Sequence, residues 1–180
     1  MRDLYQVWPC ALSTEQVDRI IGIARFQPTE EATVFSAAEA IQSIRSCTVR
    51  WLDDEWLRSL LWSYVEQANE RAFNVAVEPR SEMQLTEYAA HQFAHYDWHH
   101  DVQWNGQSGF DRKLSITVQL SDPDEYDGGD LEFDELKTNA DFRSKGTVLV
   151  FPSYLRHRIK PITRGTRRAL VAWFFGPNWR

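Results

Sequence analysis

The strongest constraint on the fold is a pair of potential ligand side chains, His99 and Asp101, placed two residues apart. On a β-strand, residues i and i+2 point to the same face of the sheet. An extended segment would therefore direct His99 and Asp101 to one point and turn His100 away. An imidazole and a carboxylate that converge can bind a metal, but this pair alone is weak evidence, and a distant ligand is needed to complete a site.

His157 is the candidate for that third ligand. The chain has five histidines, and His157 is the only one outside the segment 91–100. It follows an apolar, strongly β-forming run at 146–151. Two imidazoles and one carboxylate form the facial arrangement that binds Fe(II) and leaves positions open. The alternative for a lone histidine is a hydrogen bond to a backbone carbonyl, so the prediction depends on all three residues converging across a barrel.

Arg167 adds a charge on the strand expected after His157. A metal with one guanidinium beside it can hold a small dicarboxylate, because one end chelates the metal and the guanidinium pairs bidentately with the other. The alternative is that Arg167 is one more charge in the basic run 164–168.

The order of the expected elements indicates the fold class. Ser13 and Gln16 form a capping box that opens a helix over 14–25, and a second helix runs from Asp53 or Asp54 to about 73. Short strands are expected mainly in the second half of the chain, at 4–8, 44–51, 83–88, 114–120, 131–133, 146–151 and 169–175. The segment 114–120 alternates apolar and small polar residues, as a barrel strand does when its polar face lines a cavity.

We therefore predict an α+β fold with N-terminal helices packed on a double-stranded β-helix (jelly-roll or cupin-like) core. The prediction is one domain over 1–180, with a helical part at about 1–75 and a jelly-roll core at about 80–177. The segment 102–112 contains two glycines and is a candidate substrate lid, although a plain hairpin loop explains it equally well.

Composition limits the setting. The 180 residues carry a formal net charge of -6, which argues against a nucleic acid as partner. The two cysteines, Cys10 and Cys47, have no zinc-finger spacing. The first residues lack the apolar core of a signal peptide, and no run is long enough to cross a membrane. We expect a cytoplasmic protein without a membrane partner, and its oligomeric state stays open.

Together these residues resemble the 2-oxoglutarate- and Fe(II)-dependent dioxygenases, in the prolyl 4-hydroxylase-like branch. The resemblance covers most of the chain. It rests on the segments 84–88, 96–101, 114–117, 120–131, 151–153 and 157–170.

The resemblance implies roles for individual residues. The motif positions of the iron ligands match His99, Asp101 and His157, and Arg167 matches the position that binds the distal carboxylate of 2-oxoglutarate. A tyrosine on the strand before the ligands also contacts this cosubstrate, and here it should be Tyr88. The family places that tyrosine nine residues before the first ligand with a glycine between. Tyr88 stands eleven residues before His99 without a glycine, which implies an insertion or bulge.

Further pocket residues follow with less support from the motifs. Tyr96 is the alternative to Tyr88, and Thr117 and Gln119 are candidates for the cosubstrate pocket. Tyr96, Trp104 and Trp173 are candidates for the substrate pocket.

The activity implied is a hydroxylase that uses Fe(II), 2-oxoglutarate and O2, with ascorbate as a candidate reductant, and that releases succinate and CO2. The first expectation for its substrate is a prolyl or other residue of a protein or peptide. A free amino acid or other small molecule is the alternative, and a non-catalytic jelly-roll binding module is the second. A nucleic-acid demethylase of the same superfamily is disfavoured, because the segment 164–168 lacks that branch's Asn-x-Thr-x5-Arg pattern.

Overall fold

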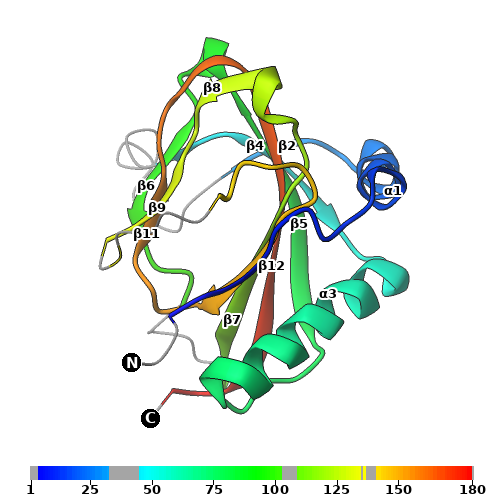
Figure 1. The fold of residues 1–180 in the computed structure, drawn as a ribbon, viewed down its shortest axis with the longest axis vertical. Coiled ribbons are helices and arrows are strands. Elements are labelled where there is room, and N and C mark those ends of the chain that lie inside the picture. The colour runs from blue at the N-terminus through cyan, green and yellow to red at the C-terminus, as the bar shows by residue number, and fades with distance from the viewer. Residues whose placement is uncertain (1–3, 33–44, 103–108, 135, 137–140, 180) are drawn as a thin grey trace.

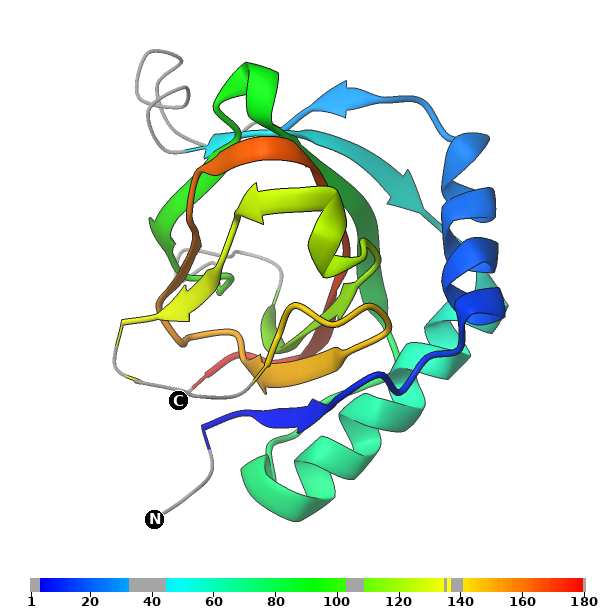
Figure 2. The same cartoon turned by 45° about the horizontal axis from the view of Figure 1, so that its top comes forward.

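The computed structural model describes residues 4–32, 45–102, 109–134, 136 and 141–179, and shows a barrel of two facing sheets with two helices on its outside (Figures 1 and 2). The larger sheet runs in the order β1 (Gln6–Trp8), β10 (Val148–Pro152), β7 (Phe110–Gln119), β12 (Ile162–Pro177), β5 (Ser81–Ala89), β4 (Thr48–Leu52) and β2 (Glu30–Glu31), while β8 (Tyr126–Gly128) pairs with the first residues of β12. The smaller sheet runs in the order β3 (Arg45–Ser46), β6 (His95–His99), β11 (His157–Ile159) and β9 (Leu131–Phe133). This architecture confirms the predicted fold class.

The helices α1 (Thr14–Arg25) and α3 (Glu55–Ala68) pack on the outer face of the larger sheet (Figure 2). The predicted capping box opens α1, and Asp54 caps α3 by accepting a hydrogen bond from the Leu57 amide. A π-helical turn, η1 (Asn69–Phe73), continues α3 to the predicted end. Among the described residues, no helix is long and apolar enough to cross a membrane.

The strand β7 divides its side chains between core and cavity, as its alternation predicted. Leu114, Ile116 and Val118 are fully buried in the core under the helices. Ser115 and Thr117 face the interior of the barrel, where Ser115 contacts Asp101. The same strand therefore anchors the helices on one face and forms the wall of a polar cavity on the other.

Two strand predictions differ from the structure. The strand predicted at 169–175 is the second half of β12, which begins at Ile162. Its first half is rich in arginine, threonine and glycine, so hydrophobic periodicity does not reveal it, although it pairs with β8 and β5. The single strand predicted at 44–51 is two strands in different sheets, because β3 pairs with β6 and β4 pairs with β5. Most of the predicted lid, residues 103–108, lies outside the described residues.

We expect the buried stripe of α3 to dominate the stability of the helix layer. Leu61 is fully buried in the core cluster, whereas its neighbour Leu60 is only half-buried at its edge. Leu61→Ala should lower the free energy of unfolding by about 2–5 kcal/mol, because it leaves a cavity that the sheet cannot fill. Leu60→Ala should cost clearly less. Urea unfolding followed by tryptophan fluorescence measures both, and a larger loss for Leu60→Ala would contradict this packing.

Candidate metal centre

Three side chains from two chain segments converge inside the barrel. β6 and β11 are antiparallel neighbours, and His99 lies directly opposite His157 in their register. Asp101 follows two residues after His99. One ligand atom from each of these residues lies within 4.8 Å of the others, and no other such group occurs in the described parts of the chain.

The sequence predicted a regular strand through the ligand segment, but the structure shows one only as far as His99. β6 ends at His99, and the amides of Asp101 and Val102 both donate to the Ser153 carbonyl, at 3.0 and 3.1 Å. The predicted division of side chains still holds. Asp101 points to the cluster, whereas the His100 ring turns away and its Nδ1 lies 2.7 Å from the Tyr154 carbonyl.

Both histidine rings are oriented by backbone carbonyls. Nδ1 of His99 lies 2.7 Å from the Asp97 carbonyl, and Nδ1 of His157 lies 2.9 Å from the Leu155 carbonyl. Because a carbonyl only accepts, each Nδ1 carries the proton, and each Nε2 of a neutral ring has a free lone pair. These Nε2 atoms both lie 3.6 Å from an oxygen of Asp101. Burial, together with the neighbouring His157, lowers the pKa of His99 to about 3, which keeps its ring neutral and able to bind a metal.

The carboxylate of Asp101 is held by Ser115, whose hydroxyl in turn contacts Ser153. Ser115 Oγ donates to Asp101 Oδ2 at 2.6 Å, and Ser153 Oγ lies 3.0 Å from Ser115 Oγ. Burial alone would raise the pKa of Asp101, but the two histidines and the Ser115 hydroxyl outweigh it and lower the pKa. Two imidazoles and one carboxylate, each oriented by a second group, fit Fe(II) in a facial site.

A narrow cavity joins this cluster to Arg167 on β12. Arg167 lies opposite Tyr88 of β5 in the sheet register, and only 4% of it is exposed. Within the described residues, no carboxylate lies within ion-pair distance of Arg167. Its neighbour Arg168 faces the other way and pairs with Glu87 at 2.9 Å. The buried guanidinium of Arg167 is thus available for an anion that enters the cavity.

The backbone beside Arg167 requires glycine. Gly129 has a φ of 66°, and a Cβ there would lie 2.2 Å from Ile162 Cδ1 and 3.1 Å from Arg167 Cδ. Any larger residue would push against Ile162 and the Arg167 side chain.

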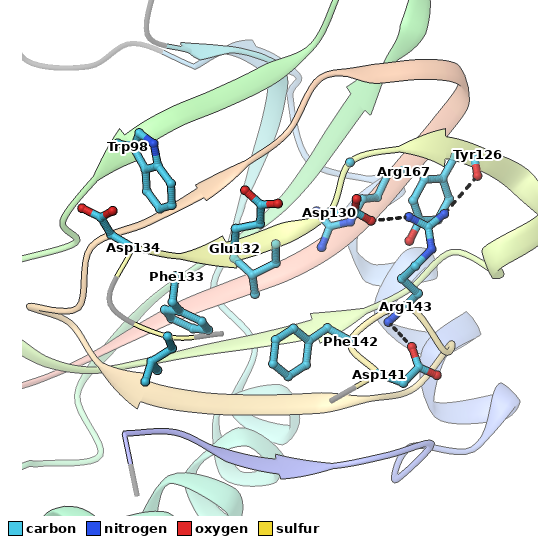
Figure 3. A pocket seen from close by; sticks show the side chains of 13 residues that line it. Trp98, Tyr126, Asp130, Glu132, Phe133, Asp134, Asp141, Phe142, Arg143 and Arg167 are labelled. Carbon is cyan, nitrogen blue, oxygen red and sulfur yellow. Dashed lines mark hydrogen bonds and ion pairs between the residues drawn. The ribbon is translucent and has the colours of Figure 1, made fainter. Parts of the chain in front are cut away.

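A second groove of about 530 Å³ also reaches Arg167 (Figure 3). Acidic residues line it, but they have partners. Asp130 pairs with Arg143 at 2.8 Å, and Glu132 pairs with Arg158 at 2.7 Å. This groove borders the candidate metal centre and does not contain the three ligand atoms.

The predicted pocket residues have different outcomes. Tyr88, Tyr96, Thr117 and Trp173 line the cavity with the ligands. Gln119 is not among the lining residues, since its amide donates to the Ser121 carbonyl and the Tyr126 hydroxyl, so its role in binding 2-oxoglutarate stays a prediction. Trp104 lies outside the described residues.

Tyr96 lies closer to the ligands than Tyr88 does. Its ring stacks on the His99 ring, with 3.4 Å between centroids. Between Tyr88 and Tyr96 the structure has a 3-10 turn, η2 (Ala90–Gln92), ended by Phe93 with a φ of 49°. This turn lies between Tyr88 and His99, in the stretch where the sequence implied an insertion or bulge.

Sequence reasoning missed three residues of the site. Ser115 lies on the polar face of the strand predicted at 114–120, so the alternation of this strand could have identified it as a cavity residue. Ser153 gave no such signal, because its contacts depend on the turn after β10. Arg45 lines the cavity from β3, and no pattern in the sequence indicates that this short strand pairs with β6.

Comparison with known proteins agrees with this geometry. Residues 83–175 match the sequence profile of the 2OG-Fe(II) oxygenase superfamily. The chain is similar to the PKHD-type hydroxylase of Crocosphaera subtropica, with 29% identity over 103 residues, which cover 56% of this chain and 46% of that protein. A second PKHD-type hydroxylase, from Hyphomonas neptunium, is 37% identical over 73 residues, covering 40% and 33%. The chain thus spans less than half the length of these relatives.

Solved structures share the fold at low sequence identity. A prolyl-4-hydroxylase from Pseudomonas putida superposes with a TM-score of 0.73 at 19% identity, covering 95% of this chain and 92% of that one. A prolyl hydroxylase from Trichoplax adhaerens, in complex with a peptide fragment of the hypoxia inducible factor oxygen degradation domain, gives 0.71 at 18% identity, covering 96% and 84%.

We expect Ser115 to act on the metal through Asp101. Ser115→Ala removes the hydrogen bond to Oδ2 and should weaken Mn(II) binding about 10–100-fold, as loss of an outer partner of a ligand does. Ser121→Ala is the control, because Ser121 is also buried but contacts the backbone at Thr166 and Arg168. Isothermal titration with Mn(II) measures both, and equal affinities for Ser115→Ala and the unmodified protein would remove Ser115 from the site.

Proposed function

Because the chain belongs to the 2OG-Fe(II) oxygenase superfamily, we propose that it is an Fe(II)- and 2-oxoglutarate-dependent hydroxylase acting on a prolyl or other residue of a protein or peptide. When bound, iron with 2-oxoglutarate and O2 supplies hydroxylation of an unactivated C–H bond, coupled to release of succinate and CO2. The protein fixes the ligands, binds the cosubstrate and aims the substrate.

One observation carries the proposal: one buried cavity is lined by the three ligand residues and by Arg167, which has no acidic partner among the described residues. His99, Asp101 and His157 would hold the iron. Arg167 would pair with the distal carboxylate of 2-oxoglutarate, and Tyr88 lies across the sheet from it. A binding module without catalysis has no need of all four groups at once, which disfavours that alternative.

The wall of the cavity offers a contact for a substrate. Trp173 is 6% exposed, lines the cavity, and its buried Nε1 has no hydrogen-bond partner among the described residues. The Arg112 guanidinium lies over its ring, 3.9 Å from the centroid. The Trp173 ring can therefore pack against a peptide substrate in the cavity. The related fold from Trichoplax adhaerens, which holds a peptide, is compatible with this substrate class.

Succinate release tests the reaction class. The protein is incubated with Fe(II), ascorbate, 2-oxoglutarate and a panel of proline-containing peptides and free amino acids. Succinate that depends on one of these substrates, matched by a gain of one oxygen in it by mass spectrometry, supports the proposal and separates peptides from free amino acids. Asp101→Ala is the inactive control. Succinate that is equal in the Asp101→Ala variant would contradict the assigned site.

Substitution of His99 and of its neighbour His100 distinguishes a metal ligand from a histidine that does not bind the metal. His99→Ala should abolish Mn(II) binding, because it removes a donor atom from the cluster. His100→Ala should retain it, since the His100 ring faces the Tyr154 carbonyl. Metal titration is the measurement, because His100 could still touch a substrate and alter turnover. Equal loss of metal in both variants would contradict the assignment.

Substitution of Arg167 and of its neighbour Arg168 distinguishes in the same way a cosubstrate-binding arginine from a surface arginine. Arg167→Ala should cost about 2–5 kcal/mol of 2-oxoglutarate affinity, because it leaves a carboxylate unpaired in a buried site. Arg168→Ala only breaks the surface pair with Glu87 and should leave the affinity nearly unchanged. Calorimetry of 2-oxoglutarate binding to the Mn(II)-loaded protein compares them. A greater loss for Arg168→Ala would mean that the register of β12 is wrong.

A further inference from the structure

Arg45 places a second guanidinium in the candidate iron cavity. It lies on β3, directly opposite Tyr96 of β6, and lines the cavity together with the three ligand residues and Arg167. Its Cζ lies 4.6 Å from the centre of the Tyr96 ring, which in turn stacks on His99. The Tyr96 ring thus lies between Arg45 and His99, a proposed iron ligand.

Within the described parts of the chain, the polar contacts of Arg45 do not balance its charge. Its Nε donates to Cys47 Sγ at 3.0 Å, a weak acceptor. No carboxylate of the described residues lies within ion-pair distance. Other arginines around the barrel do have acidic partners: Arg112 pairs with Glu82 at 2.6 Å, and Arg50 pairs with Glu87 at 3.2 Å. A desolvated cation without an anion is costly, so Arg45 is placed to receive one.

Neither iron nor 2-oxoglutarate supplies that anion. The positive charges of Fe(II) and Arg167 together equal the negative charges of Asp101 and the two carboxylates of 2-oxoglutarate. The loaded site would therefore be neutral, and the charge of Arg45 would remain in excess. Since no described carboxylate pairs with Arg45, we look to the substrate that is to be hydroxylated for the balancing negative charge.

We propose that Arg45 binds a carboxylate of the primary substrate and so selects an acidic peptide or amino acid. This inference rests on the proposed function and narrows its substrate class. The carboxylate has two possible sources, an acidic side chain next to the hydroxylated residue of a peptide or the free α-carboxylate of an amino acid. Arg45 and the Trp173 ring would then both contact the substrate in the cavity.

A different role for Arg45 would be to hold Tyr96 and His99 in place by stacking. That role acts through the metal ligand, so it would appear as a change in metal affinity. Substrate recognition would appear as a change in the preference for acidic over neutral ligands. The two roles can therefore be separated by binding measurements without turnover.

The experiment uses the full chain loaded with Mn(II) and 2-oxoglutarate without O2, and titrates matched probes by calorimetry. The peptide pair is acetyl-Gly-Pro-Glu-amide against acetyl-Gly-Pro-Gln-amide, and the amino-acid pair is L-proline against L-prolinamide. The variants are Arg45→Gln and Arg45→Lys. Arg50→Gln is the matched control, because Arg50 lies on the next strand outside the cavity.

We expect the acidic member of one pair to bind about 10–100-fold tighter than its neutral partner, and the responding pair identifies the source of the carboxylate. Arg45→Gln should remove this preference while it still binds Mn(II), Arg45→Lys should keep part of it, and Arg50→Gln should keep all of it. The inference is overturned by three results: no acid preference in either pair, a preference that survives in Arg45→Gln, or a loss of Mn(II) affinity in that variant. Failure of the proposed function would instead appear as an unmodified protein that binds neither Mn(II) nor 2-oxoglutarate.

Discussion

The candidate metal centre depends on the antiparallel pairing of β6 with β11. This ladder places His99 opposite His157, although the two residues are far apart in sequence. The Ser153 carbonyl, directly after β10, accepts hydrogen bonds from the amides of Asp101 and Val102 and so holds Asp101 in the same space. Backbone hydrogen bonds therefore fix the geometry before any metal is present, which reduces the ordering needed when a metal binds.

The larger sheet supplies the rest of the site through the polar faces of its strands. Ser115 on β7 holds the carboxylate, and Arg167 on β12 carries the charge opposite it in the cavity. The opposite faces of these strands are packed under α1 and α3, so the helices hold the wall of the cavity rigid from outside. The core under the helices contains no residue of β6 or β11, the strands that position the ligands. A change in the helix layer should therefore affect stability more than the positions of the ligands.

The sequence predicted those parts of the site that local periodicity encodes. The alternation at 114–120 identified β7, and the spacing of His99 and Asp101 identified the direction of their side chains even though β6 ends at His99. The sequence could not predict contacts that depend on how strands far apart in the chain pair with one another. Arg45 and Ser153 enter the site only because β3 pairs with β6 and because the turn after β10 meets the ligand segment. The polar first half of β12 was missed because pairing partners, rather than apolar residues, make it a strand.

The central claim is that His99, Asp101 and His157 hold one metal ion within reach of a dicarboxylate bound to Arg167. Crystals grown with Mn(II) and 2-oxoglutarate, measured at the manganese absorption edge, test it most directly. The account predicts a single anomalous peak between the two Nε2 atoms and an Asp101 oxygen, with the far carboxylate of 2-oxoglutarate on Arg167. A peak in the acidic groove around Asp130 and Glu132, or a dicarboxylate that does not reach Arg167, would contradict it.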